Sequence, residues 1–184
     1  MVEKVVKLLV RNGEIVQEEI EIYQYGLELL TKKLLHVFVI LFIGFIGDEF
    51  FEVLVFLMAY ASIREYAGGY HAKTEIGCYC CTGVVTLSTL FFLQKFQTLR
   101  IGWIWLMLVA CGIVIWLFSP QEALNKPLSV REKLVYRKKA HFYLFLEGLL
   151  CLSGFFLETV LYGITCAWTI QTVMFFTGWF SKKR

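Results

Sequence analysis

The sequence predicts an all-α fold: a polytopic integral membrane helical bundle of about six transmembrane helices, with an amphipathic segment at the N-terminus. Hydrophobic residues make up 58% of the 184 residues, against roughly 45–50% in ordinary soluble domains, and the mean hydropathy is +0.65. The apolar stretches are long and repeated, and only helices and closed barrels satisfy their main chain in a bilayer. Because the stretches lack the alternation of barrel strands, we expect one helical membrane domain over residues 1–184.

Six stretches are candidates for membrane spans because each approaches the ~20 apolar residues that cross a bilayer. They cover residues 27–47, 49–66, 78–94, 100–118, 140–157 and 159–180. The first two have short uncharged centres, so Lys32, Lys33 and Glu52 must extend toward the membrane surface from the ends of these spans. A polar turn at Asp48 and Glu49 separates them.

Residues 1–26 form an amphipathic lead-in to the first span. The apolar side chains that follow helical spacing are Val2, Val5, Val6 and Leu9. The basic side chains, which lie elsewhere on the helix, are Lys4, Lys7 and Arg11. This pattern suits a helix on the membrane surface and equally a solvated lead-in helix. Asn12-Gly13 should end this helix. The mixed charges lack the continuous apolar core of a cleavable secretory signal, so we expect none.

The distribution of Lys and Arg predicts the orientation of the spans. Sixteen of the 18 basic residues fall in four segments: before the first span or at its start, at the end of the second span or between it and the third, between the fourth and fifth, and after the last. Lys32, Lys33 and Arg64 are the ones at span ends. The alternate connections hold only Lys95 and Arg100. By the positive-inside rule, both termini and the segments 64–77 and 119–139 face the cytoplasm of a multi-pass protein in the cell membrane. The net charge of +3 gives no indication of nucleic acid, and we expect no such partner.

Residues 64–78 contain the side chains best suited to catalysis. His71 and Cys78 lie seven positions apart, flanked by Gly68, Gly69 and Gly77. A nucleophilic thiolate needs a neighbour that lowers its pKa and moves a proton, and histidine does both. Seven residues of straight helix rise about 10.5 Å, too far for a hydrogen bond, so the segment must bend if the two side chains act together. The alternative is a flexible interfacial loop that merely contains one His and one Cys.

Several motifs resemble the accessory gene regulator B family, the membrane peptidases of Gram-positive quorum sensing. They are Tyr-Ala-Gly-Gly-Tyr-His-Ala at residues 66–72 with Cys78 seven residues after the His, Tyr-Gly-Leu-Glu-Leu-Leu at 25–30, Ser119-Pro120, and Asn-Lys-Pro-Leu at 125–128 before a basic run. The resemblance implies that His71 and Cys78 are a catalytic pair. It also implies cleavage of a propeptide near its C-terminus, a thioester-linked core that closes to a lactone or thiolactone autoinducing peptide, and a homodimer.

The resemblance also suggests residues that bind the propeptide. Arg64 matches an arginine that precedes the family motif, and it could bind a substrate carboxylate or cap the second span. The segment 119–139 is expected to be a basic loop that docks the acidic tail of a family propeptide, or a determinant of topology. Its basic residues are Lys126, Arg131, Lys133, Arg137, Lys138 and Lys139.

Two polar residues lie inside the last two spans. A carboxylate within a membrane span is costly and therefore a functional candidate. Glu147 lies about two turns into the fifth span and is a candidate for substrate binding. Its expected partner is His141, His36 or a basic side chain. Gln171, midway along the sixth span, is expected to form a hydrogen bond between helices.

Three other functions compete with a peptidase. Cys78 and Cys81 form a C-x-x-C motif, as in a membrane thiol oxidoreductase, although a cytoplasmic location disfavours disulfide formation. The spacing of His36, His71 and His141 matches no metal-binding motif, so we expect no metal and no cofactor. A peptide transporter or membrane adaptor is the third alternative. The expected partners are therefore the propeptide, the lipid bilayer and a second copy of the chain.

Overall fold

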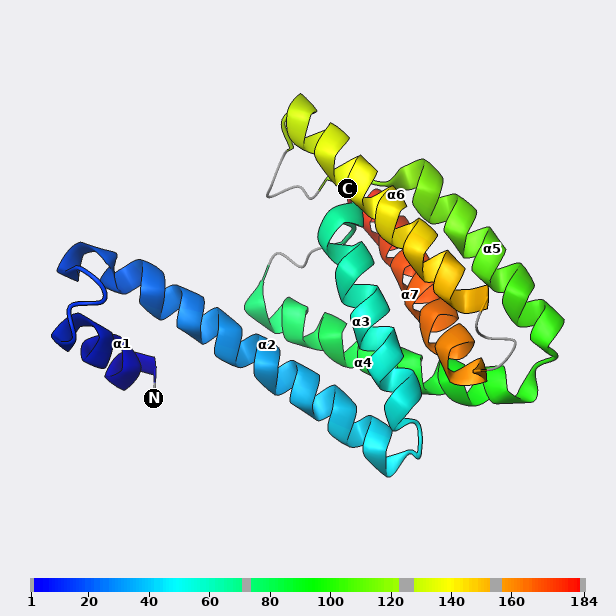
Figure 1. Cartoon of the computed structure of the whole chain (residues 1–184), viewed down its shortest axis with the longest axis horizontal. Coiled ribbons are helices and arrows are strands. Elements are labelled where there is room, and N and C mark those ends of the chain that lie inside the picture. The colour runs from blue at the N-terminus through cyan, green and yellow to red at the C-terminus, as the bar shows by residue number, and fades with distance from the viewer. Residues whose placement is uncertain (1, 71–73, 123–127, 153–156, 183–184) are drawn as a thin grey trace. The chain divides into compact units, whose positions relative to one another are not determined.

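The structure is a computed structural model that describes residues 2–70, 74–122, 128–152 and 157–182 (Figure 1). Within these residues the regular elements are all helices. They are α1 (Val2–Arg11), the short 3-10 helix η1 (Gln17–Glu19), α2 (Ile20–Ile46), α3 (Phe50–Ala67), α4 (Glu75–Thr98), α5 (Ile101–Phe118), α6 (Val130–Cys151) and α7 (Glu158–Lys182). The all-α prediction is confirmed.

Each of the six expected spans falls on one of the helices α2 to α7, but the boundaries differ most at α6. This helix begins at Val130 and ends at Cys151, whereas residues 140–157 were expected. Residues 130–139 of the expected basic loop at 119–139 are therefore helical, which corrects that prediction. The expected single domain over residues 1–184 stays a prediction.

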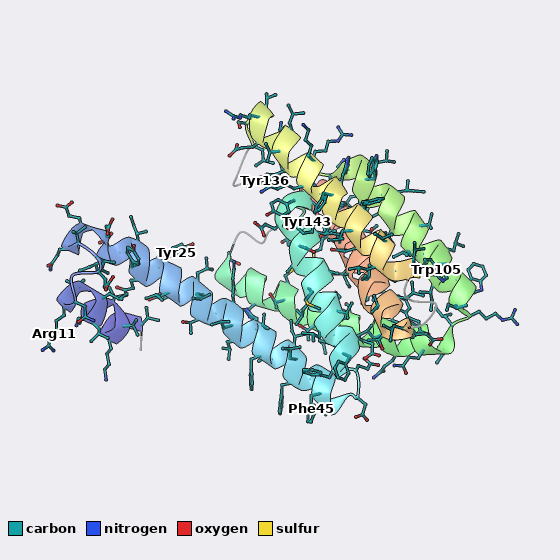
Figure 2. The ribbon with its side chains drawn as sticks, in the orientation of Figure 1. Arg11, Tyr25, Phe45, Trp105, Tyr136 and Tyr143 are labelled. Atoms are coloured by element: carbon teal, nitrogen blue, oxygen red, sulfur yellow. The ribbon has the colours of Figure 1, made fainter. Side chains whose placement is uncertain are left out.

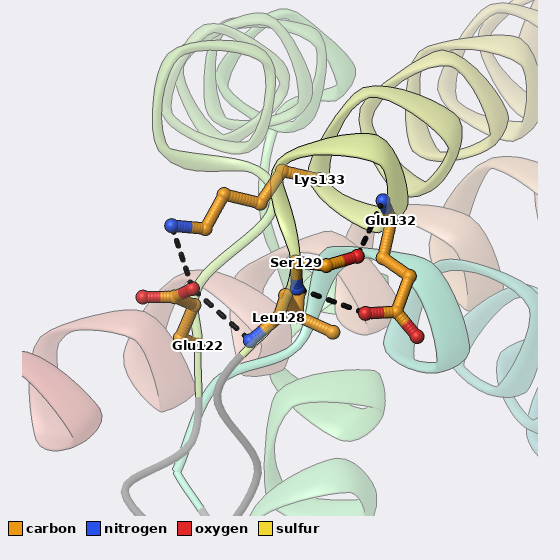
Figure 3. A network of polar contacts seen from close by, with 5 residues as sticks. All are labelled: Glu122, Leu128, Ser129, Glu132 and Lys133. Atoms are coloured by element: carbon orange, nitrogen blue, oxygen red, sulfur yellow. Dashed lines mark hydrogen bonds and ion pairs between the residues drawn. The ribbon is translucent and has the colours of Figure 1, made fainter.

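A capping box explains where α6 begins. The main-chain nitrogen of Ser129 donates to the Glu132 carboxylate at 2.8 Å, and the main-chain nitrogen of Glu132 donates to the Ser129 hydroxyl at 3.3 Å (Figure 3). These reciprocal bonds satisfy main-chain donors that a helix start leaves without partners. The Ser-x-x-Glu pattern was present in the sequence, but the run of charges around it was interpreted as a loop.

Residues 1–40 form one compact unit and residues 41–184 a second. In the first unit, α1 buries Val6 while Lys4 and Lys7 stay exposed. Arg11, at the end of α1, is also exposed (Figure 2). The helix ends at Arg11 and Gly13 adopts a φ of 73°, so the predicted break at Asn12-Gly13 is confirmed.

Helix α7 is the central element of the second unit, where it packs against α3, α4, α5 and α6. Residues 161–171 of α7 are all buried. Glycines permit the close helix crossings that are common in membrane bundles. A Cβ atom at Gly163 would lie 2.7 Å from Val55 of α3, and one at Gly112 of α5 would lie 2.8 Å from the Trp168 ring of α7.

Three helical segments are long and apolar enough to cross a membrane among the described residues: Gln17–Ile46, Ile101–Phe118 and Glu158–Phe180. Large apolar side chains of α5, such as Trp103, Leu106 and Leu117, are exposed. A soluble domain rarely exposes so continuous an apolar surface, so the chain is a membrane protein. The expected spans on α3, α4 and α6 stay predictions.

Substituting Gly112 tests the close crossing of α5 and α7. The Gly112→Ala variant should lose roughly 1–3 kcal/mol of stability, because its methyl group overlaps the rigid ring of Trp168, and thermal unfolding in detergent measures the loss. Gly102→Ala is the matched control in the same helix, since nothing lies within 4 Å of a Cβ atom there. Equal melting temperatures for Gly112→Ala and Gly102→Ala would contradict the packing at Trp168.

Candidate functional site

The chain turns sharply just after α3, at residues 68–70 (the bent segment), as the predicted His/Cys pairing requires. Helix α3 ends at Ala67 and α4 begins at Glu75, and Gly68 and Gly69 have φ values of 75° and 122°. L-residues with a side chain rarely adopt such angles. Residues 68–78 are thus not one straight helix, which confirms the bend for the main chain. His71 lies outside the described residues, so its pairing with Cys78 stays a prediction.

Arg64 holds the main chain that leads to His71. Its Nη1 donates to the Gly68 carbonyl at 2.6 Å, and its Nη2 donates to the Tyr70 carbonyl. The planar guanidinium therefore links two carbonyls that lie two residues apart, with charge-assisted hydrogen bonds. This geometry makes Arg64 a structural part of the bent segment. A contact between Arg64 and a substrate carboxylate stays a prediction.

Helix α7 forms hydrogen bonds to the main chain of the bent segment. Gln171, which is fully buried, donates its Nε2 to the Gly68 carbonyl at 2.8 Å. The main-chain nitrogen of Tyr70 donates to the Met174 carbonyl at 3.1 Å. Gln171 was expected to form a hydrogen bond to another helix. Its partner is instead the Gly68 carbonyl, which lies just after α3. Sequence reasoning did not assign Gln171 to the site, although an amide in the middle of an apolar span was the available signal.

Gln121 is a second residue that sequence reasoning missed. Its main-chain nitrogen donates to the Ala67 carbonyl at 2.8 Å, and its side-chain Nε2 donates to the Phe175 carbonyl of α7 at 3.1 Å. A Cβ atom at Gly68 would lie 2.1 Å from the Gln121 carbonyl oxygen. The glycine is therefore required both for its φ angle and for the close approach of the Gln121 main chain.

The start of α4 places Cys78 in the first turn of a helix. Thr74 is the N-cap residue, and its hydroxyl accepts from the main-chain nitrogen of Gly77 at 3.1 Å. A helix N-terminus carries a partial positive charge that stabilises a thiolate. The prediction that Cys78 lies at the opening of this helix is confirmed for the main chain. Cys81 follows three residues later in the same helix, so the backbone alone does not distinguish a peptidase from a thiol oxidoreductase.

Aromatic contacts attach the basic part of α6 to the end of α3. The Tyr66 ring stacks on Tyr143 with centroids 5.5 Å apart, and meets Tyr136 edge-on at 5.8 Å (Figure 2). The Lys139 ammonium lies 4.8 Å from the Tyr66 ring centroid, within cation–π distance. Because Tyr66 precedes Gly68 by two residues, the basic stretch of α6 lies next to the bent segment.

The basic residues predicted to bind substrate have different environments. Lys133 forms a 2.8 Å ion pair with Glu122, which also accepts from the main-chain nitrogen of Leu128 at 3.2 Å (Figure 3). The side chains of Arg131, Arg137 and Lys138 are exposed on α6. Lys126 lies outside the described residues.

Glu147 connects three helices inside the second unit. The carboxylate is 5% exposed, and it accepts from the Ser62 hydroxyl of α3 at 2.6 Å and from Trp168 Nε1 of α7 at 2.8 Å. The expected partners were wrong, because both observed donors are neutral. His141 instead stacks on Trp116, with ring centroids 3.7 Å apart. Substrate binding by Glu147 stays a prediction.

The helix ends of the second unit separate into two groups. The bent segment contacts Gln121, just after α5, and Met174, near the end of α7. At the other end, Thr159 near the start of α7 donates to Glu52 near the start of α3 at 2.9 Å. Helices α3 and α7 therefore run parallel. Within the described residues, no group of three His, Cys, Asp or Glu side chains forms a metal site at either end.

The chain is similar to proteins that are named as accessory gene regulator B or AgrB-like proteins. The putative AgrB-like protein 2 of Clostridium perfringens strain 13 is 26% identical, over 86% of this chain and 82% of the relative. The accessory gene regulator protein B of Staphylococcus carnosus is 29% identical, over 82% of this chain and 80% of the relative. No solved structure matches the chain.

The family comparison covers nearly the whole chain. The model described as accessory gene regulator B matches residues 2–176, a range that includes the bent segment, the basic part of α6 and most of α7. The chain therefore belongs to the accessory gene regulator B family.

Proposed function

We propose that the chain is a membrane cysteine endopeptidase that cleaves the C-terminal tail from a small quorum-sensing propeptide and retains the core as a thioester. The observation that carries this proposal is the bent main chain between α3 and α4. It leads from an anchored Tyr70 directly to His71, and it ends at a helix whose first turn contains Cys78.

In the proposed reaction, His71 accepts the proton of Cys78, and the helix N-terminus and the resulting imidazolium stabilise the thiolate. The Cys78 sulfur attacks the scissile carbonyl carbon and forms a C–S bond. The C–N bond then breaks, and His71 donates the proton to the leaving amine. Main-chain N–H groups of the first turn of α4 have no partners within the helix, and one of them can donate to the oxyanion.

Ring closure follows from the same thioester. A thiol or hydroxyl of the propeptide gives its proton to His71, now neutral, and attacks the carbonyl carbon. The C–S bond to Cys78 then breaks, and the Cys78 thiolate forms again beside the imidazolium. One His/Cys pair can thus serve both steps, because the cleavage step conserves the acyl group in an activated form.

We further propose that the site faces the cytoplasm and that both termini lie there. The bent segment, the basic part of α6 and the C-terminal half of α7 belong to the same end of the second unit. Lys95 lies in the last turn of α4, and Arg100 is the residue just before α5. The Phe96 ring, beside Lys95, lies 6.5 Å from the Tyr162 ring near the start of α7. This separation of basic residues supports the orientation expected from the positive-inside rule.

The exposed basic side chains of α6 offer a docking surface for an acidic propeptide tail. Arg131, Arg137 and Lys138 are exposed, and the Tyr66 contacts hold this helix beside the bent segment. An acidic tail bound here would place the preceding peptide bond near the His/Cys pair. Complementary charges of this kind increase the rate and specificity of association.

Substitution of three residues tests the catalytic proposal. Co-expression with an amphipathic propeptide that has an acidic tail, followed by mass spectrometry, measures cleavage. Cys78→Ala should abolish cleavage because it removes the nucleophile, and His71→Ala should slow it by roughly 10²–10⁴-fold because it removes the proton acceptor. Cys81→Ala is the matched control and should cleave normally. Loss of activity in Cys81→Ala alone would instead favour the thiol oxidoreductase.

Charge removal on α6 tests propeptide docking. The double variant Arg137→Gln, Lys138→Gln should raise KM roughly threefold to tenfold with little change in kcat, because exposed ion pairs contribute at most about 1 kcal/mol each. The effect should shrink at high salt. The control is Lys95→Gln, Arg100→Gln, which removes the same charge around the junction of α4 and α5. A similar KM for both double variants would exclude docking at this surface.

A further inference from the structure

The main-chain groups just before His71 are held by α7, through one side chain and one main-chain carbonyl. The Gly68 carbonyl accepts from Gln171 Nε2 at 2.8 Å as well as from Arg64 Nη1 at 2.6 Å. Two residues later, the Tyr70 nitrogen donates to the Met174 carbonyl. Tyr70 is bonded directly to residue 71, so the position at which His71 leaves the anchored chain depends on α7.

The buried amide of Gln171 lowers the stability of the fold compared with an apolar side chain at this position. It lies in the buried run 161–171 of an apolar helix and is fully buried. Its Oε1 has no hydrogen-bond partner among the described residues, and a buried polar atom without a partner lowers stability. An apolar side chain would avoid this cost, so packing alone does not explain an amide here.

The surface of α7 is also shaped to receive the bent segment. A Cβ atom at Gly178 would lie 3.1 Å from the Tyr70 nitrogen and 2.8 Å from Gln121 Oε1. The glycine therefore lets the main chain of Tyr70 and the side chain of Gln121 approach the helix closely. Gln121 in turn donates to the Phe175 carbonyl of α7.

We infer that Gln171 is a positioning residue for His71. Together with Met174 and Gly178 of α7, it holds the main chain of residues 68–70 in place and so fixes where the chain reaches His71. The inference rests on the proposed His71/Cys78 pair. Gln171 acts through the Gly68 carbonyl, by fixing the main chain from which His71 extends. Removing the Nε2 donor of Gln171 should weaken the effect of His71 on the reactivity of Cys78, while the helices stay folded.

Alkylation of Cys78 by iodoacetamide as a function of pH tests the inference without a substrate. A Cys80→Ala, Cys81→Ala background leaves Cys78 as the thiol near the site, and mass spectrometry follows it. The His71/Cys78 pair should keep Cys78 reactive at pH 6, since only the thiolate reacts, and His71→Ala should lower that rate at least ~10-fold. Gln171→Met should shift the pH profile toward that of His71→Ala. The control Thr169→Val removes another buried hydrogen-bonding group of α7 and should retain the original profile.

Gly178→Ala gives an independent test that removes no buried polar group. Its methyl group should push Tyr70 and Gln121 away from α7 and produce the same shift in pH profile. The overlap should lower the melting temperature, as overpacking does, while the protein remains folded. Gly83→Ala is the control, as a Cβ atom there has nothing within 4 Å. An unshifted profile in a folded Gln171→Met variant, or in Gly178→Ala, would overturn the role of α7. Identical profiles for His71→Ala and the background protein would instead overturn the His/Cys pair itself.

Discussion

The hydrogen bonds to the main chain of residues 68–70 are the interaction on which the site depends. Residues 68–70 are not helical, so main-chain polar groups that they bury need hydrogen-bond partners from other parts of the protein. The Gly68 carbonyl has two donors, from Arg64 and Gln171, and the Tyr70 nitrogen bonds to the Met174 carbonyl. These bonds allow the chain to leave α3, turn through two glycines and begin α4 within a few residues.

Helix α7 is the most buried helix of the second unit because α3, α4, α5 and α6 all pack against it. Its first half packs against α3 and α5 through Gly163 and Trp168, and its second half receives the bent segment. Glu147 adds a buried polar link from α6 to α3 and α7 through Ser62 and Trp168. Neutral donors stabilise this carboxylate, so it serves the assembly of the helices near the site. The last helix in the sequence thus holds the main chain at Gly68, which lies 103 residues before Gln171.

The sequence was sufficient for features that depend on local pattern. Hydropathy located the helices, the glycines before His71 predicted the bend, and the His/Cys motif indicated the family. Pairings between distant residues could not be predicted, because they depend on how each helix is rotated about its axis. Gln171 and Gln121 were missed for that reason, and the partner of Glu147 was predicted wrongly. The early start of α6 was missed because a charged amphipathic turn and a solvated loop have similar composition.

Hydrogen exchange at the Tyr70 amide tests the central claim most directly, with the protein in lipid nanodiscs and mass spectrometry resolving the residues between α3 and α4. If the bent segment is anchored to α7, this amide should exchange at least about a hundredfold more slowly than in an unstructured peptide. Replacement of Gln171 by Met should remove much of that protection. Exchange of the Tyr70 amide at the unstructured rate in the unmodified protein would show that the segment is not held by α7, and the account of the site would fail.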